Sequence, residues 1–306
     1  MSVAIISHPK CIRHDLGAQH PEQPARLSVI NDQLISSGLS YVCPQHYSEK
    51  ASLAQLRLVH DEKYLNYIFD NAPKEGVLDI DGDTQMMPAT LEAAQFAAGA
   101  GVMAVDLLMN KEHRAAFCPV RPPGHHAEKD KAMGFCFFNN IALCAKYAIA
   151  EYALERVAII DFDVHHGNGT QDIVQGDDRI LFCSSFEHPF YPFSGDKATA
   201  SNVHNIPLNA DISSAQFREA VSAWFAKIDD FAPQLILISA GFDGHVADQM
   251  SSHSLVDADY HWLTAQLVAL ADKHAQGRII SMLEGGYAIN ALGRTVVAHL
   301  KALLKS

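Results

Sequence analysis

The amino-acid sequence predicts an α/β fold in which helices cover both faces of a central, mostly parallel sheet. Short apolar runs alternate with longer segments of helical periodicity along all 306 residues. Most of the short runs are continuously apolar, as strands are when helices bury both of their faces. No internal repeat, low-complexity run or Pro/Gly/Ser-rich linker divides the chain. We therefore expect a single domain over residues 1–306.

The predicted elements follow one another in the alternating order that such a fold requires. The predicted strands are Val3–Ser7, Arg114–Cys118, Arg156–Ile160, Ile180–Ser184, Leu235–Ala240 and Arg278–Leu283. The predicted helices are Pro24–Ser37, Thr90–Met109, Asn140–Tyr152, Ser213–Phe231, Asp257–His274 and Ala288–Lys305. Ser213 and Asp257 are expected N-caps, and Gly38 is expected to end the first helix.

The composition narrows the class of protein. No run of about 18 apolar residues and no signal-peptide pattern appears, so we expect no membrane partner. The net charge of -12 argues against a nucleic-acid partner, which needs a basic face. The six cysteines form no CxxC pair, which predicts reduced, buried thiols in a cytoplasmic protein. The 17 histidines are the unusual feature, because several of them cluster with Asp and Gly.

The strongest cluster is DFDVHHGNG, which follows the predicted strand Arg156–Ile160 directly. Side chains alternate along an extended chain, so Asp161, Asp163 and His165 point to one side. Buried carboxylates beside an imidazole need hydrogen bonds or a cation, and Asp and His are common ligands of divalent metals. A polar strand exit held only by backbone hydrogen bonds is the alternative.

Three further motifs follow predicted strands, where the carboxyl ends of a parallel sheet gather ligands. Asp243 in GFD supplies a third metal ligand, and three protein ligands leave positions open for water and substrate. His125 and His126 follow the stiff RPPG loop and suit proton transfer. Tyr287 in EGGY can donate a hydrogen bond to an oxyanion. In isolation, a turn with a capping Asp, a surface or metal-binding His pair and a packed Tyr are the alternatives.

Together the motifs resemble one known family. RPPGHHA, MGFCFFNN, DFDVHHGNG, SAGFD and LEGGY occur in the order seen in histone deacetylases and in the related acetylpolyamine amidohydrolases, and HPEQPARL resembles the N-terminal segment of that family. The MGFCFFN pattern and Asn168 are similar to the class II pattern, including the histone deacetylase-like amidohydrolases of bacteria. The resemblance implies the arginase/deacetylase fold, an amidohydrolase that releases acetate from an acylated amine, and one catalytic zinc ion, with iron(II) as the alternative.

The resemblance also implies a role for each matching residue. The metal ligands would be Asp163, His165 and Asp243, and the catalytic groups His125, His126, Tyr287 and Asp161, which orients His125. Asp161, Asp163, His165 and Ser184 would hold a structural potassium ion. The substrate would be lined by Gly134, Phe135, Tyr191, Gly286, Met250 and His20, although Tyr191 and Phe135 can also be packing residues. Asn168 carries no charge, so His126 stays neutral more easily, as a base requires.

The substrate is the least determined point. Polyamine-selective relatives place an acidic residue seven positions after the last Asp ligand, where this chain has Met250. That favours acetyl-lysine or a small acylated amine over an acetylpolyamine. A binuclear ureohydrolase typically has DxHxD, whereas the fifth position here is Gly167. A non-catalytic acyl-lysine-binding module would lack a catalytic residue, and none is missing. A monomer or a small homo-oligomer is expected.

Overall fold

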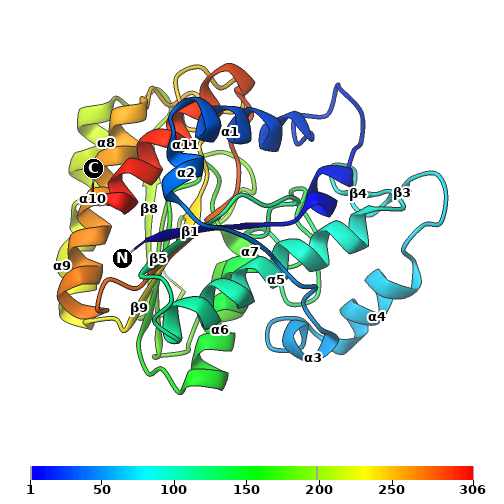
Figure 1. Ribbon diagram of the computed structural model, residues 1–306, viewed down its shortest axis with the longest axis horizontal. Helices are drawn as coiled ribbons and strands as arrows, with labels where there is room; N and C mark the ends of the chain where they lie inside the picture. The colour runs from blue at the N-terminus through cyan, green and yellow to red at the C-terminus, as the bar shows by residue number, and fades with distance from the viewer. Residues whose placement is uncertain (1, 198, 306) are drawn as a thin grey trace.

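The computed structural model, which describes residues 2–197 and 199–305, contains one parallel sheet that runs through the middle of the molecule (Figure 1). Its eight strands lie in the order β2-β1-β5-β10-β9-β6-β7-β8 within the described part of the chain. They are β1 (Val3–Ser7), β2 (Gln45–Tyr47), β5 (Ala115–Cys118), β6 (Val157–Asp161), β7 (Ile180–Glu187), β8 (Val203–Leu208), β9 (Leu235–Ala240) and β10 (Ile279–Leu283). A separate antiparallel pair consists of β3 (Leu78–Asp79) and β4 (Gln85–Met86).

The helices form a layer on each side of this sheet (Figure 1). On one side α5 (Thr90–Met109) and α6 (Asn140–Tyr152) pack together, and on the other α11 (Ile289–Leu304) packs against α1 (Ala25–Ser36) and α10 (Asp257–His274). The others are η1 (Pro9–Arg13), α2 (Leu39–Val42), α3 (Leu53–Leu56), α4 (Glu62–Asp70), α7 (Asn168–Val174), α8 (Ser214–Val221) and α9 (Ala223–Phe231).

The sheet topology brings the motif-bearing strands together. β5, β10, β9 and β6 are consecutive neighbours although they are far apart in the sequence. In the parallel register Asp161 pairs with Ser184 on one side and with Ser239 on the other. The loops that follow these strands therefore leave the sheet at the same edge, as the sequence analysis expected.

All six predicted strands are confirmed to within one residue at their starts, and β7 continues to Glu187. The predicted helix Ser213–Phe231 is wrong, because it consists of α8 and α9 separated at Ser222. Ser213 is confirmed as an N-cap that accepts a hydrogen bond from the Gln216 N–H. Asp257 is not an N-cap but the first residue of α10. Gly38 follows α1 in the left-handed region (φ 78°), as predicted.

Two expectations from composition have different outcomes. The six cysteines are free and buried, as predicted. By contrast, α5 is long and apolar enough to cross a membrane by length and composition alone, with a mean hydropathy of 1.3 over 18 residues. Of that window 67% is buried inside the structure, where α5 packs against β1, β5 and α6. Its apolar character is that of a helix that packs largely into the protein core.

The buried His299 on α11 predicts a loss of stability in acid. Its ring contacts the Thr264 and Ser281 hydroxyls at 2.7 and 2.9 Å, and burial lowers the pKa of His299 to about 3. The unfolded chain binds this proton below about pH 6.5, so the stabilising contribution is present above that pH and is lost as the pH falls towards 3.

We expect His299→Gln to be less stable near neutral pH but less sensitive to acid. Between about pH 7.5 and about pH 5, the free energy of unfolding should fall by about 2 kcal/mol less than in the parent. Urea unfolding at both pH values measures this difference. An equal fall in both proteins would show that His299 does not contribute to the acid sensitivity.

Candidate active site

The loop after β6 carries the centre of the site. Asp161, the last residue of β6, contacts Nδ1 of His125 through its Oδ2 at 2.9 Å, and its Oδ1 accepts a hydrogen bond from the Asp163 N–H. The Asp163 Oδ1 in turn accepts from the His165 N–H at 2.9 Å. These local hydrogen bonds turn the chain away from the sheet and fix the directions of the side chains that follow.

Asp163, His165 and Asp243 form a buried group whose possible ligand atoms all lie within 4.8 Å of one another. The Asp243 Oδ1 accepts from the Val164 N–H at 3.0 Å, whereas the buried Asp243 Oδ2 accepts no hydrogen bond and lies 3.2 Å from the His165 Nδ1. A buried carboxylate oxygen without a hydrogen bond is costly unless it meets a cation. Two carboxylates and one imidazole suit zinc or iron(II), so the donor set fits a catalytic divalent ion.

The backbone is close to this group on the side of β10. The Gly285 N–H donates to the Asp163 Oδ2 at 2.8 Å. A Cβ at position 285 would lie 2.0 Å from the Asp243 Oδ2 and 2.6 Å from the Asp163 Oδ2. Only glycine leaves room for both carboxylates here, which gives the EGGY motif a physical reason.

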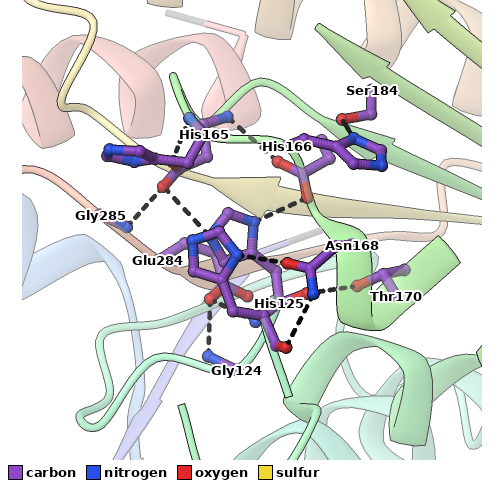
Figure 2. A network of polar contacts seen from close by, with 12 residues as sticks. Gly124, His125, His165, His166, Asn168, Thr170, Ser184, Glu284 and Gly285 are labelled. Carbon is purple, nitrogen blue, oxygen red and sulfur yellow. Dashed lines mark hydrogen bonds and ion pairs between the residues drawn. The ribbon is translucent and has the colours of Figure 1, made fainter. Parts of the chain in front are cut away.

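The two tandem histidines lie beside the metal-ligand group. Their ring centroids are 4.0 Å apart, and the His126 ring lies 5.9 Å from the His165 ring. The Glu284 Oε2 accepts from the Gly124 and His125 N–H groups at 2.7 and 3.1 Å, so Glu284 anchors the loop that carries both histidines (Figure 2).

The two imidazoles have opposite electrostatic environments. Burial disfavours a charged His125, but the negative charges of Asp161 and Asp163 outweigh it and raise the pKa of His125 well above its usual value. Burial, reinforced by His125 and His165, lowers the pKa of His126 well below its usual value. A pair whose pKa values are pushed apart suits one histidine to act as a base and the other to carry positive charge.

Asn168 fixes the tautomer of His126. Its Oδ1 contacts the His126 Nδ1 at 2.7 Å, and its Nδ2 donates to the Glu128 Oε1 at 2.7 Å. The Asn168 amide oxygen therefore faces the ring. Because this oxygen can only accept, the His126 Nδ1 carries the proton of the hydrogen bond. The other ring nitrogen, Nε2, is left with a lone pair.

Asn168→Asp is expected to move the acid limb of the activity profile. The new carboxylate beside His126 would stabilise its protonated form and raise its pKa. We expect the acid limb of kcat/KM to move to higher pH by about one unit. A pH series with both proteins tests this, and an unchanged limb would mean that His126 is not the group that titrates in the reaction.

Aromatic rings surround the two histidines and Tyr287. The Tyr191 ring lies 5.2 Å from the His126 ring, and the Phe135 ring lies 4.8 Å from that of His20 and 6.2 Å from that of Tyr287. Phe190, which the sequence analysis did not single out, stacks on His165 at 5.5 Å. The predicted substrate-lining residues Phe135, Tyr191 and His20 thus lie around the catalytic groups. That Phe135 and Tyr191 face each other across a substrate channel stays a prediction.

The remaining predicted residues are placed as follows. Ser184 lies beside Asp161 in the sheet, and its hydroxyl contacts the His166 Nδ1 at 3.1 Å (Figure 2). Its role in a potassium site stays a prediction. Gly134 has a positive φ of 56°, and its N–H donates to Asp83. The Met250 N–H donates to Asp248 at 3.0 Å. Gly286 is described with Arg26 below.

Sequence reasoning missed the side chains that support the Tyr287 loop. The Arg26 guanidinium lies over the Tyr287 ring, 4.9 Å from its centroid, and its Nε donates to the Gly286 carbonyl at 2.7 Å. Arg26 also donates to the Glu284 carbonyl and to the buried Glu22. Arg26 belongs to the HPEQPARL segment, so its motif was visible but its contact with Tyr287 was not.

A model of the histone deacetylase domain matches residues 20–303 of the chain. The chain belongs to the histone deacetylase family. A probable deacetylase of Archaeoglobus fulgidus is 35% identical over 94% of this chain and 82% of its own length. An uncharacterized protein of Synechocystis is 36% identical over 99% of both chains. Type-2 histone deacetylase 2 of Dictyostelium discoideum is 35% identical over 98% of this chain, but over only 20% of its own length.

The fold agrees with this assignment. The crystal structure of the HDA15 HD domain superposes with a TM-score of 0.92 at 28% identity, covering 100% of this chain and 88% of that one. With the family and the buried metal-ligand group established, the chain is a metal-dependent deacetylase, an amidohydrolase. Space also opposes a binuclear ureohydrolase centre: a Cβ at Gly167 would lie 2.2 Å from the Asp161 Oδ2, so a carboxylate side chain does not fit at that position.

Proposed function

We propose that this histone deacetylase family member uses zinc to hydrolyse the acetamide of acetyl-lysine, or of a similar acylated amine, to acetate and the free amine. The observation that carries the proposal is the position of His126, oriented by Asn168, next to the buried group of Asp163, His165 and Asp243. Iron(II) is the alternative ion, because the same donor set binds it and availability decides. A potassium ion at Asp161, Asp163, His165 and Ser184 would be structural, and the protein would act in the cytoplasm.

His126 is the proposed general base. When bound, a divalent ion lowers the pKa of a water molecule and polarises the substrate carbonyl. The His126 Nε2 accepts the proton of the attacking water, because Nδ1 is already committed to Asn168. Asp161 holds His125 in place and favours its charged form, which would stabilise the negative charge that develops. The His126 imidazolium, formed when Nε2 accepts the proton of the water, returns a proton to the leaving amine.

Tyr287 is the proposed donor to the oxyanion. Burial raises the pKa of Tyr287 well above its usual value, so its hydroxyl stays protonated and able to donate. Tyr287→Phe is expected to lower kcat by about 100- to 1,000-fold while metal content stays unchanged. Steady-state kinetics together with metal analysis tests this. Full activity of the variant would remove Tyr287 from the mechanism.

The substrate assignment rests on the residues around the site. Aromatic rings at Phe135 and Tyr191 suit an aliphatic stem that ends in an acetamide. Met250 offers no charge to a second amine of a polyamine. An acetylpolyamine is the second candidate, because the same chemistry serves both substrates.

The test is turnover of an acetyl-lysine peptide beside N-acetylputrescine, with and without a chelator and with zinc restored. Chelator-sensitive turnover of the peptide with little turnover of acetylputrescine supports the proposal. Preferred hydrolysis of acetylputrescine would contradict the inference from Met250 that the enzyme disfavours polyamines, and would leave the proposed reaction mechanism unchanged. No turnover of either by protein that holds one metal ion per chain would contradict both substrate classes.

A further inference from the structure

We propose that Asp248 is a positioning residue that holds the catalytic loop of Tyr287 in its working conformation. The proposal rests on the proposed role of Tyr287 as the oxyanion donor. Asp248 lies five residues after the metal ligand Asp243, is only 7% exposed and has no contact with the metal-ligand atoms among the described hydrogen bonds. Both of its carboxylate oxygens are used by backbone N–H groups.

The Asp248 carboxylate joins two segments. Its Oδ2 accepts hydrogen bonds from the Tyr287 N–H at 2.6 Å and from the Ala288 N–H at 2.8 Å. Its Oδ1 accepts from the Met250 N–H at 3.0 Å. Hydrogen bonds to an ionised, buried carboxylate are stronger than neutral ones. One side chain therefore ties the loop after β9 to the loop after β10, close to the metal-ligand group.

The peptide unit between Gly286 and Tyr287 is held at both of its polar atoms. Arg26 donates to the Gly286 carbonyl at 2.7 Å from one side, and Asp248 accepts from the Tyr287 N–H on the other. Gly286 has no Cβ and adopts a φ of 119°, so its own conformational preferences do not fix the peptide that follows, and neighbouring groups must hold it. The orientation of the peptide sets the direction in which the Tyr287 side chain leaves the backbone.

Asp248 also supplies a charge that α11 lacks at its start. The N-cap of α11 is Ala288, which has no side-chain oxygen to cap the helix. The Asp248 carboxylate binds the Ala288 N–H instead, where the partial positive charge of the helix N-terminus stabilises an anion. The N-cap residue of α11 and the backbone of Tyr287 are therefore held by the same carboxylate, and the Tyr287 hydroxyl would be positioned less accurately if Asp248 were removed.

The test compares the kinetics of Asp248→Ala, Asp248→Asn and the control Val246→Ala on whichever of the acetyl-lysine peptide and N-acetylputrescine the parent hydrolyses faster. Val246 lies in the same loop and its side chain is 56% exposed. We expect Asp248→Ala to lower kcat by about 10- to 100-fold with KM changed less, because small displacements of a catalytic group have effects of that size. Metal content should stay unchanged. Asp248→Asn keeps one acceptor oxygen and should lose less, and Val246→Ala should match the parent.

A double-mutant cycle with Tyr287→Phe separates positioning from general damage. If Asp248 acts through the Tyr287 hydroxyl, adding Asp248→Ala to Tyr287→Phe should lower kcat by less than about threefold. An equally large loss in both backgrounds, a loss of metal, or full activity of Asp248→Ala would overturn the proposal. An inactive parent would instead contradict the proposed function, and a fully active Tyr287→Phe would overturn both roles. If Asp248→Ala does not fold, Asp248→Asn serves in the same cycle.

Discussion

Asp243→Asn is expected to remove the bound metal ion and to lower kcat/KM by about 1,000-fold or more. Asp243 is one of three ligands, and its Oδ2 is the buried oxygen without a hydrogen-bond partner. The amide keeps the size of the side chain and can still accept from the Val164 N–H, but it removes the negative charge that binds the ion. The several kcal/mol of transition-state stabilisation that a catalytic metal provides corresponds to this loss.

Metal content and turnover should be measured on the same preparations. Asp106→Asn is the matched control, because Asp106 lies on α5 and accepts hydrogen bonds from Tyr147 and Tyr152 through one oxygen that an amide retains. We expect this control to keep one ion per chain and full activity. If Asp243→Asn also kept its metal and its activity, the assignment of the ligand group would be wrong.

The strands and the metal-ligand group could be predicted from the sequence because both depend on local patterns. A strand buried on both faces is continuously apolar, so β6 and β9 were recognised from their own residues. Asp161, Asp163 and His165 follow β6, and Asp243 follows β9, which is its neighbour in the sheet. Because the carboxyl ends of parallel strands meet at one edge of the sheet, the sequence alone predicts that these ligands lie close together, although it gives no distances between them.

The two edge strands and the helix break were not predictable in the same way. β2 and β8 lie at the two ends of the sheet; no residue of β2 is buried, and only two of the six residues of β8 are buried, with Pro207 exposed. An edge strand tolerates proline and polar residues, so it lacks the apolar run by which a central strand is recognised. The break between α8 and α9 at Ser222 has no proline or glycine to mark it.

The contacts of the supporting charged side chains were missed because their partners are distant in the sequence. Asp248 is 40 residues from Ala288, Glu284 is 159 residues from His125 and Arg26 is 260 residues from Gly286. Each of these contacts is between a side chain and the backbone, and backbone groups leave no residue-specific signal in the sequence. The catalytic residues can therefore be predicted from motifs, whereas the groups that position them are identified only from the folded structure.

Glu22→Gln is expected to destabilise the folded protein by about 3–5 kcal/mol. Glu22 lies between Arg26 and Arg121, and all three side chains are fully buried. It binds the Arg26 Nη1 at 3.0 Å and two nitrogens of Arg121. Removing one partner of a buried ion pair leaves an uncompensated charge, which is the most costly change that such a cluster can undergo. Urea unfolding near neutral pH measures the loss.

The same cluster should make stability depend on pH in strong acid. Burial opposes the ionised carboxylate, but Arg121 and Arg26 outweigh it and lower the pKa of Glu22 to about 2. Its contribution is present above about pH 4.3, the value in the unfolded chain, and is lost as the pH falls towards 2. The control is Glu62→Gln, whose pair with Arg57 is exposed and should contribute less than about 1 kcal/mol. Equal stability losses in the two variants would mean that the buried cluster is no more important to the fold than a surface ion pair.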